Sequence, residues 1–252
     1  MRQTLLICKR GLGSLFRSPL GYIVITLFLF CCGLIFSAIV LQQSLSIQTF
    51  RDPNQPLAVN KAYWGACGMV MLFVMPLVSM SSIAGEKTSR TLELLLTSPL
   101  RLGHIILGKY LALMVFFVIM IAPTGVYFVF LRVYGGLALR QVFCAYLAAL
   151  LLGSCLAAFG VFISALTRNM IIAAFATFIG GFIFWVAEAA ANYLPSYGRV
   201  AASYLSLYIH FTDMAAGRVG LDDLAFFITF TIFFLLATRI AIRLLWVKGK
   251  WA

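Results

Sequence analysis

Charged residues, and acidic ones above all, are scarce in this chain. Its 252 residues include 7 Asp and Glu and 2 His, only 10% are charged, and 63% are hydrophobic. A soluble globular domain carries about one quarter charged residues, so this composition excludes that class. The longest polar interval is about 30 residues, which is too short for an independent soluble domain.

Residue patterns for catalysis and metal binding are also missing. The two histidines, His104 and His210, are far apart in the sequence and belong to no HExxH or related metal motif. The six cysteines lie within or beside apolar runs without a CxxC pair, as is typical of small packing residues. We therefore predict that this chain has no catalytic site and binds no metal or other cofactor.

One stretch comes close to a nucleotide-binding loop. Residues 103–110, GHIILGKY, match the pattern GxxxxGK[ST] except that Tyr110 replaces the small hydroxyl residue that binds Mg²⁺. A P-loop follows a buried strand, whereas this stretch begins an apolar run. Any ATP and Mg²⁺ that this protein uses are therefore expected on another polypeptide.

Long apolar runs recur along the whole sequence. Six of them reach about the 20 residues that a helix needs to cross a bilayer. None shows the alternation of a barrel strand, so the spans are predicted to be helices. The sequence indicates an all-α integral membrane protein, a single transmembrane domain over residues 1–252 with spans at 20–41, 62–84, 105–131, 142–166, 170–191 and 224–245.

Lysine and arginine placement predicts the orientation of these spans. With both termini inside, 13 of the 19 Lys and Arg residues lie on the cytoplasmic side. The remaining six are Arg51, Lys61, Arg132, Arg140, Arg199 and Arg218. The formal net charge of +12 is then a topology signal plus attraction to anionic lipid, and no nucleic-acid partner is expected. The first span is too long for a cleaved signal peptide and is expected to remain as an anchor.

The segment before the first span, residues 1–19, is predicted to form an amphipathic interfacial helix. Its basic residues share one side of a helical wheel, and Ser18-Pro19 ends the helix before the chain enters the membrane. The opposite side is apolar, with Leu6 and Ile7 as exceptions. A plain basic flank of the first span is the alternative. The basic side consists of Arg2, Lys9, Arg10 and Arg17, and the apolar side of Leu5, Cys8, Leu12, Leu15 and Phe16.

The segment between the second and third spans, residues 85–104, has a similar two-sided order. If residues 86–98 are helical, Glu86, Arg90, Glu93 and Thr97 share one face, and three leucines lie opposite. Such a helix can bury its leucines and offer its charges to a partner. The alternative is a solvated loop whose salt bridges contribute little.

The outer segment, residues 192–223, mixes turn residues with an apolar run over 200–211. This run is too short to cross a bilayer and too apolar for a free loop. We expect short re-entrant or interfacial helices here.

Three stretches resemble ABC-2-type transporter permeases, most closely the gliding-motility-associated (Gld-type) group. EKTSRTLELLLTSPLRLGHIILGKYLA resembles the cytoplasmic loop and third span of these permeases, and FRSPLGYIV at 16–24 resembles the start of their first span. YLSLYIHFTDMAAGRVGLDDLAFFITFTIFFLLAT resembles their last loop and span. The resemblance covers nearly the whole chain, and the Glu-Lys to Thr-Ser-Pro string is its specific part.

This resemblance implies a multi-pass subunit of the bacterial cytoplasmic membrane that pairs with a second permease protomer and docks onto a cytoplasmic ABC ATPase. It implies a connecting helix containing Lys9, Arg10, Phe16 and Arg17. It also implies re-entrant helices before the last span, with Pro195, Tyr204 and His210 as the candidate residues. The coupling helix that contacts the ATPase would contain Glu86, Lys87, Arg90, Thr91, Glu93 and Leu94.

Two functions share these features. The first is the permease subunit of an ABC transporter, driven by a separate ATPase and acting as an exporter or in extraction from the inner leaflet. The second is a non-transporting membrane adaptor that passes ATP-driven motion to an extracytoplasmic accessory subunit. The sequence does not separate them, because both need the same spans and the same cytoplasmic helix.

Overall fold

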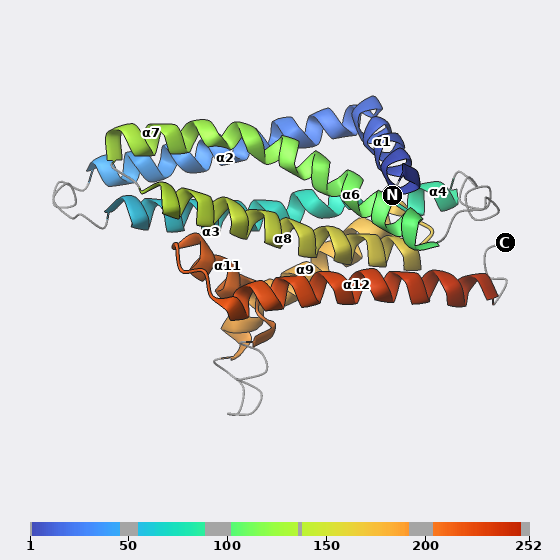
Figure 1. Cartoon of the computed structure of the whole chain (residues 1–252). Coiled ribbons are helices and arrows are strands. Elements are labelled where there is room, and N and C mark those ends of the chain that lie inside the picture. The colour runs from blue at the N-terminus through green and yellow to red at the C-terminus, as the bar shows by residue number, and fades with distance from the viewer. Residues whose placement is uncertain (1, 46–54, 89–101, 136–137, 192–203, 248–252) are drawn as a thin grey trace.

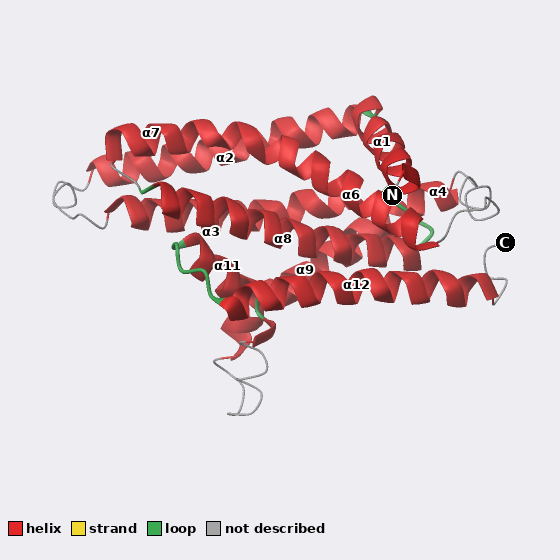
Figure 2. Ribbon diagram, viewed as in Figure 1, coloured by secondary structure: helices red, strands yellow, loops and turns green. Residues whose placement is uncertain are grey.

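The computed structural model describes residues 2–45, 55–88, 102–135, 138–191 and 204–247. Every regular element in these ranges is a helix (Figures 1 and 2). The elements are α1 (Arg2–Arg17), α2 (Pro19–Leu45), α3 (Gln55–Ser79), α4 (Ala84–Thr88), α6 (Leu102–Ile121), the 3-10 helix η2 (Ala122–Thr124), α7 (Gly125–Gly135), α8 (Leu139–Leu166), α9 (Met170–Ala191), α11 (Leu207–Ala215) and α12 (Leu221–Val247).

Six helical segments of the described chain are long and apolar enough to cross a membrane. This confirms the predicted all-helical membrane protein with six spans, whereas the N-in, C-in orientation stays a prediction. The segments are Pro19–Gln42, Leu57–Thr88, Leu102–Val133, Leu139–Leu166, Met170–Ala189 and Leu221–Leu244.

Two prolines within spans have different effects. Pro76 lies inside α3, which continues to Ser79 before a turn leads into α4. Pro123 lies in η2, which separates α6 from α7. The third span therefore consists of two α-helices joined by one tighter turn, because proline removes a backbone donor from the helical ladder.

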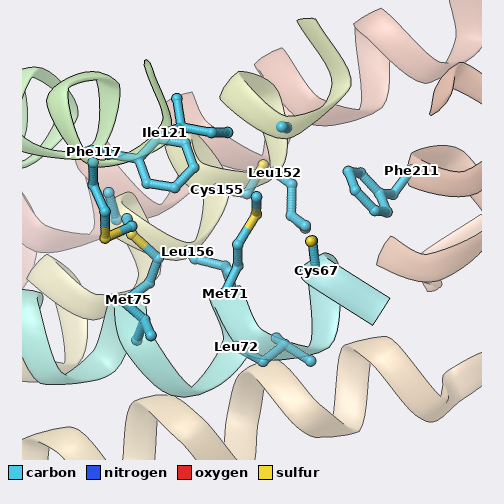
Figure 3. Packing of buried hydrophobic residues seen from close by; sticks show 14 of the residues in the cluster. Cys67, Met71, Leu72, Met75, Phe117, Ile121, Leu152, Cys155, Leu156 and Phe211 are labelled. Atoms are coloured by element: carbon cyan, nitrogen blue, oxygen red, sulfur yellow. The ribbon is translucent and has the colours of Figure 1, made fainter. Parts of the chain in front are cut away.

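The core of the bundle lies around α8, which contacts α3, α6, α9, α11 and α12. Its small residues allow this close packing. A Cβ on Gly153 would lie 2.7 Å from Phe117 Cδ1 of α6, and one on Gly160 would lie 2.6 Å from Ser79 Cβ of α3. Gly153 and Gly160 of the fourth span therefore pack against helices of the same protomer. Met71, Met75, Leu152 and Leu156 fill the space beside it (Figure 3).

Two regions of the bundle carry shorter helices. At one end, α1 lies beside the start of α6 and near α4 (Figure 1). Elsewhere α11 packs against α8, α3 and α9 and leads into α12. These two regions hold all the predicted site residues that the structure describes.

Candidate functional site

The helix α1 packs directly on α6. A Cβ on Gly108 of α6 would lie 2.8 Å from Ile7 Cβ and 3.0 Å from the carbonyl oxygen of Thr4. Only glycine permits this approach of the two backbones. Farther along α1, the Phe16 and Phe116 rings lie 5.4 Å apart. The predicted helix over residues 1–19 is thus present and belongs to the bundle, while its position at a membrane surface stays a prediction.

The packing face of α1 differs from the one that the helical wheel predicts. Ile7 contacts α6 although the wheel makes it an exception, and Leu5 of the predicted apolar side is 65% exposed. The reason lies in the neighbouring helix, because the absence of a side chain at Gly108 of α6 fixes which residues of α1 approach it. The basic residues Lys9, Arg10 and Arg17 are exposed.

The turn between α3 and α4 is held by one hydroxyl group of α8. Ser164 Oγ accepts hydrogen bonds from the backbone N–H groups of Ile83, at 3.1 Å, and Ala84, at 2.8 Å. It donates to the carbonyl oxygen of Met80 at 3.0 Å. Because Ser164 is fully buried, these three bonds are shielded from water. They fix where the second span ends and where α4 begins.

The side chains of α4 extend this attachment to the end of α8. Lys87 Nζ donates to the carbonyl oxygens of Ala165 and, at 3.2 Å, of Thr167. A lysine at the C-terminus of a helix binds carbonyl groups that lack intrahelical donors and complements the helix dipole. Thr88 Oγ1 lies 2.9 Å from the carbonyl oxygen of Arg168. The helix α4 is therefore bound to α8 at both of its ends.

An ion pair joins α4 to α6. Lys109 Nζ lies 2.5 Å from Glu86 Oε1 and also donates to the carbonyl oxygen of Ser82. The two side chains are 10% and 23% exposed, respectively. Loss of one partner would leave a poorly solvated charge, which makes such a pair costly to break. Together with α1, these contacts form what we call the basal junction, the contact region of α1, α4, α6 and the end of α8.

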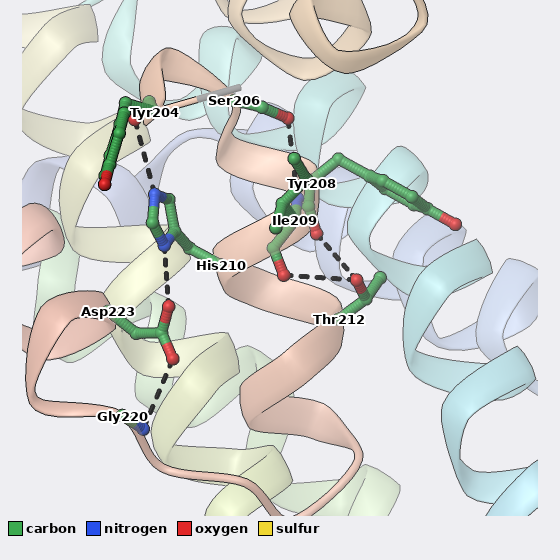
Figure 4. A network of polar contacts seen from close by, with 8 residues as sticks. All are labelled: Tyr204, Ser206, Tyr208, Ile209, His210, Thr212, Gly220 and Asp223. Carbon is green, nitrogen blue, oxygen red and sulfur yellow. Dashed lines mark hydrogen bonds and ion pairs between the residues drawn. The ribbon is translucent and has the colours of Figure 1, made fainter. Parts of the chain in front are cut away.

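A second polar network lies between α11 and α12 (Figure 4). His210 Nδ1 lies 2.6 Å from Asp223 Oδ1, and His210 Nε2 lies 3.3 Å from the carbonyl oxygen of Tyr204. Both ring nitrogens thus face oxygen atoms, a carboxylate on one side and a backbone carbonyl on the other. The same carboxylate accepts from the backbone N–H of Gly220, and Ser206 caps α11 through the N–H of Ile209.

A family profile described as "ABC-2 family transporter protein" matches residues 32–195. The chain belongs to this family. The match begins within α2 and ends after α9, so it contains the turn, α4 and the ion pair of the basal junction. No curated protein matches the chain.

Membership makes the chain a transporter permease, a multi-pass membrane component without its own catalytic site. It also implies an ABC ATPase partner in general terms. Consistent with this role, the near-P-loop residues 103–110 lie inside the continuous helix α6, and Lys109 binds Glu86.

The predicted site residues of this ABC-2 family permease fall into two groups. Glu86 and Lys87 lie in the basal junction, where the bonds described above connect them to α6 and α8. His210 and Tyr204 lie in the network between α11 and α12. The other predicted residues of these segments, Arg90, Thr91, Glu93, Leu94 and Pro195, lie outside the described residues.

Sequence reasoning missed two residues of the basal junction. It only counted Lys109 among the 13 cytoplasmic Lys and Arg residues, but Lys109 is 9% exposed and paired. It gave Ser164 no bonding role. A signal existed for Lys109, since a lone lysine seven residues inside a helix that begins at Leu102 needs a partner. None existed for Ser164, because its role depends on a turn 80 residues away.

Proposed function

We propose that this chain is the permease subunit of an ABC-2-type exporter in the bacterial cytoplasmic membrane. It works with a second permease protomer, as a homodimer or half of a heterodimer, and a separate cytoplasmic ATPase drives it. Among ABC-2 permeases we assign it to the Gld-type group on the sequence resemblance. In this assignment residues 85–104 form the coupling segment.

The observation that carries the proposal is the rigid base of this segment. Three bonds of Ser164, the bonds of Lys87 and the Glu86–Lys109 ion pair join α4 to two spans. A displacement of α4 is therefore passed to α6 and α8 through these bonds. Such transmission requires two states that differ in contact free energy at the segment, which a moving ATPase supplies.

The roles of the predicted residues then separate. Glu86 and Lys87 act as positioning residues at the base, and Arg90, Thr91, Glu93 and Leu94 provide the ATPase contact. The exposed cations Lys9, Arg10 and Arg17 belong to α1, the predicted connecting helix, which packs beside this base.

The test measures ATP hydrolysis by the partner ATPase with and without this chain in proteoliposomes. Charge reversal at both Arg90 and Glu93 is expected to abolish stimulation while the unfolding midpoint of the permease is unchanged. Glu86→Lys is expected to lower both the stimulation of ATP hydrolysis and the unfolding midpoint, because it places a second lysine beside Lys109. The double variant Glu86→Lys, Lys109→Glu restores the pair and is expected to recover both.

Lys61→Glu is the matched control, because Lys61 is an exposed cation at the start of α3 and distant in sequence from the segment. Stimulation that survives the Arg90 and Glu93 reversal would overturn the coupling assignment. Full stimulation without movement of any lipid-linked, peptide or polysaccharide cargo would favour the mechanical adaptor over the exporter.

A further inference from the structure

A cavity of about 600 Å³ lies at the basal junction, between α1, the start of α2, α4 and α6. Its volume falls in the usual range of sites for small molecules, roughly 300–1,000 Å³. One part of its wall is apolar, with Leu6, Leu15, Leu20 and Leu113 among its residues. The other part is polar and charged. A cavity of this kind fits an amphiphile better than a fully soluble molecule.

The charged residues of the cavity favour an anion. Arg10, Lys109 and Glu86 all line it, which gives two cations and one carboxylate. Lys109 and Glu86 pair with each other. Arg10 is exposed and forms no ion pair with any described residue. The uncompensated charge of the cavity is therefore the guanidinium of Arg10, a group well suited to phosphate.

A buried hydroxyl group gives independent support for a ligand. Ser82 lines the cavity, is 8% exposed, and its Oγ has no hydrogen-bond partner among the residues that the structure describes. Buried hydroxyl groups are nearly always bonded, and a missing partner calls for an explanation. A phosphate or glycerol oxygen in the cavity would supply the missing bond. Ser14 and Ser18 add further hydroxyl groups to the wall.

The location of the cavity indicates where its ligand comes from. The helix α1 forms one wall, and Pro19 connects it directly to the first candidate span. Leu5 and Leu6 of α1 are 65% and 68% exposed, as expected for a helix that lies against lipid. With α1 at the membrane surface, as the sequence predicts, the mouth of the cavity would lie at the depth of phospholipid headgroups.

From these observations we infer that the cavity binds one anionic phospholipid of the surrounding leaflet. Its phosphate contacts Arg10 and the hydroxyl group of Ser82. The parts of its acyl chains nearest the headgroup lie along the leucines. The lipid becomes part of the basal junction, since it contacts both α1 and the α4–α6 ion pair. This inference goes beyond the exporter assignment and does not depend on it.

The test is lipid retention by the full-length chain. The protein is released from nanodiscs of phosphatidylglycerol and phosphatidylcholine in equal parts, and native mass spectrometry counts the lipids bound. The wild-type chain is expected to retain one phosphatidylglycerol in preference to phosphatidylcholine. Arg10→Gln is expected to reduce that preference about fivefold, which corresponds to the loss of one cation–headgroup contact of about 1 kcal/mol.

Two matched controls share the helix and the charge of Arg10. Lys9→Gln and Arg17→Gln remove exposed cations of α1 that do not line the cavity, so retention should stay at the wild-type level. Ser82→Ala should lower retention without lowering the unfolding midpoint, because Ser82 Oγ bonds no described residue.

Four outcomes would overturn the inference. Equal loss in the Arg10, Lys9 and Arg17 variants would show general surface attraction, and unchanged retention in Ser82→Ala would contradict the placement of the phosphate. Equal retention of phosphatidylcholine would exclude an anion site. Displacement of the lipid by excess inorganic phosphate or glycerol 3-phosphate would assign the cavity to a soluble anion.

Discussion

The six candidate spans divide into a central and a peripheral set. In the central set, α3, α6 with α7, and α8, the buried share of the apolar stretch is 61%, 56% and 72%. In the peripheral set, α2, α9 and α12, it is 17%, 22% and 28%. Both sets are apolar enough to span a membrane. Hydropathy therefore locates a span but does not tell whether it lies inside the bundle.

Side-chain size separates the two sets better than hydropathy does. On α8, glycine and alanine face neighbouring helices, and Gly153, Ala157 and Gly160 give α3 and α6 room to approach. On α9, bulky residues such as Ile171, Phe175 and Ile179 are more than half exposed. Lipid offers apolar side chains the same solvation as a protein core, so helix association in membranes depends on fit. The bulky faces are available to lipid or to a second protomer.

The largest expected change in stability comes from truncating a buried apolar side chain, compared with truncating an exposed one. Leu152→Ala on α8 removes a fully buried side chain from the core and leaves a cavity. We expect it to lower the free energy of unfolding by about 3 kcal/mol. Ile232→Ala on α12, where Ile232 is 52% exposed, should change it by less than about 0.5 kcal/mol. The measurement is the unfolding midpoint in detergent.

If Ile232→Ala lowers the free energy of unfolding as much as Leu152→Ala does, the division into central and peripheral spans does not hold for one protomer. That result would mean that the exposed face of α12 is covered in the working assembly. Repeating the measurement at protein concentrations that dissociate dimers distinguishes coverage by a second copy from an effect within the chain.

The next effect tests whether glycine sets the spacing of the central helices. Gly160→Ala introduces a methyl group 2.6 Å from Ser79 Cβ, so α3 or α8 must move. We expect a loss of about 2 kcal/mol from this overpacking. The control is Gly65→Ala on α3, where a Cβ meets no atom within 4 Å. That variant should be neutral or stabilising by up to about 1 kcal/mol, because alanine favours the helix. Equal midpoints for the two variants would refute the spacing argument.

The sequence predicts the spans well because their signal is local. Each needs only about 20 apolar residues, and the predicted and observed segments overlap in all six cases. The split of the third span at Pro123 is also local, since proline acts on its own turn. These features need no knowledge of neighbouring helices.

The basal junction could be predicted only in part, because its bonds are not local. Ser164 binds the turn before α4, and Lys109 binds Glu86, across gaps of about 80 and 23 residues in the chain. Ile7 illustrates the same limit, since its contact depends on the absence of a side chain at Gly108. A helical wheel treats each helix alone. It therefore assigns the packing face correctly only when the surface of the neighbouring helix is uniform in side-chain size.

The smallest expected effect concerns the attachment of a peripheral span. Asp223, in the first turn of α12, binds His210 of α11 at 2.6 Å, and Phe226 stacks on the same imidazole ring. Asp223→Asn removes the negative charge but keeps the shape. We expect a loss of about 1.5 kcal/mol, as for a hydrogen bond to a charged group. The unfolding midpoint and the hydrogen exchange of α11 amides measure it.

Asp222→Asn is the control for that variant, because Asp222 is an exposed carboxylate in the same first turn of α12. Both changes remove one negative charge near the N-terminus of α12, where the helix dipole stabilises a carboxylate by about 0.5 kcal/mol. The dipole effect is common to both variants, so the difference between them measures the contact with His210. If α11 exchanges equally fast in both, the histidine does not hold α11 to α12, and the peripheral span is attached through its contacts with α8 and α6.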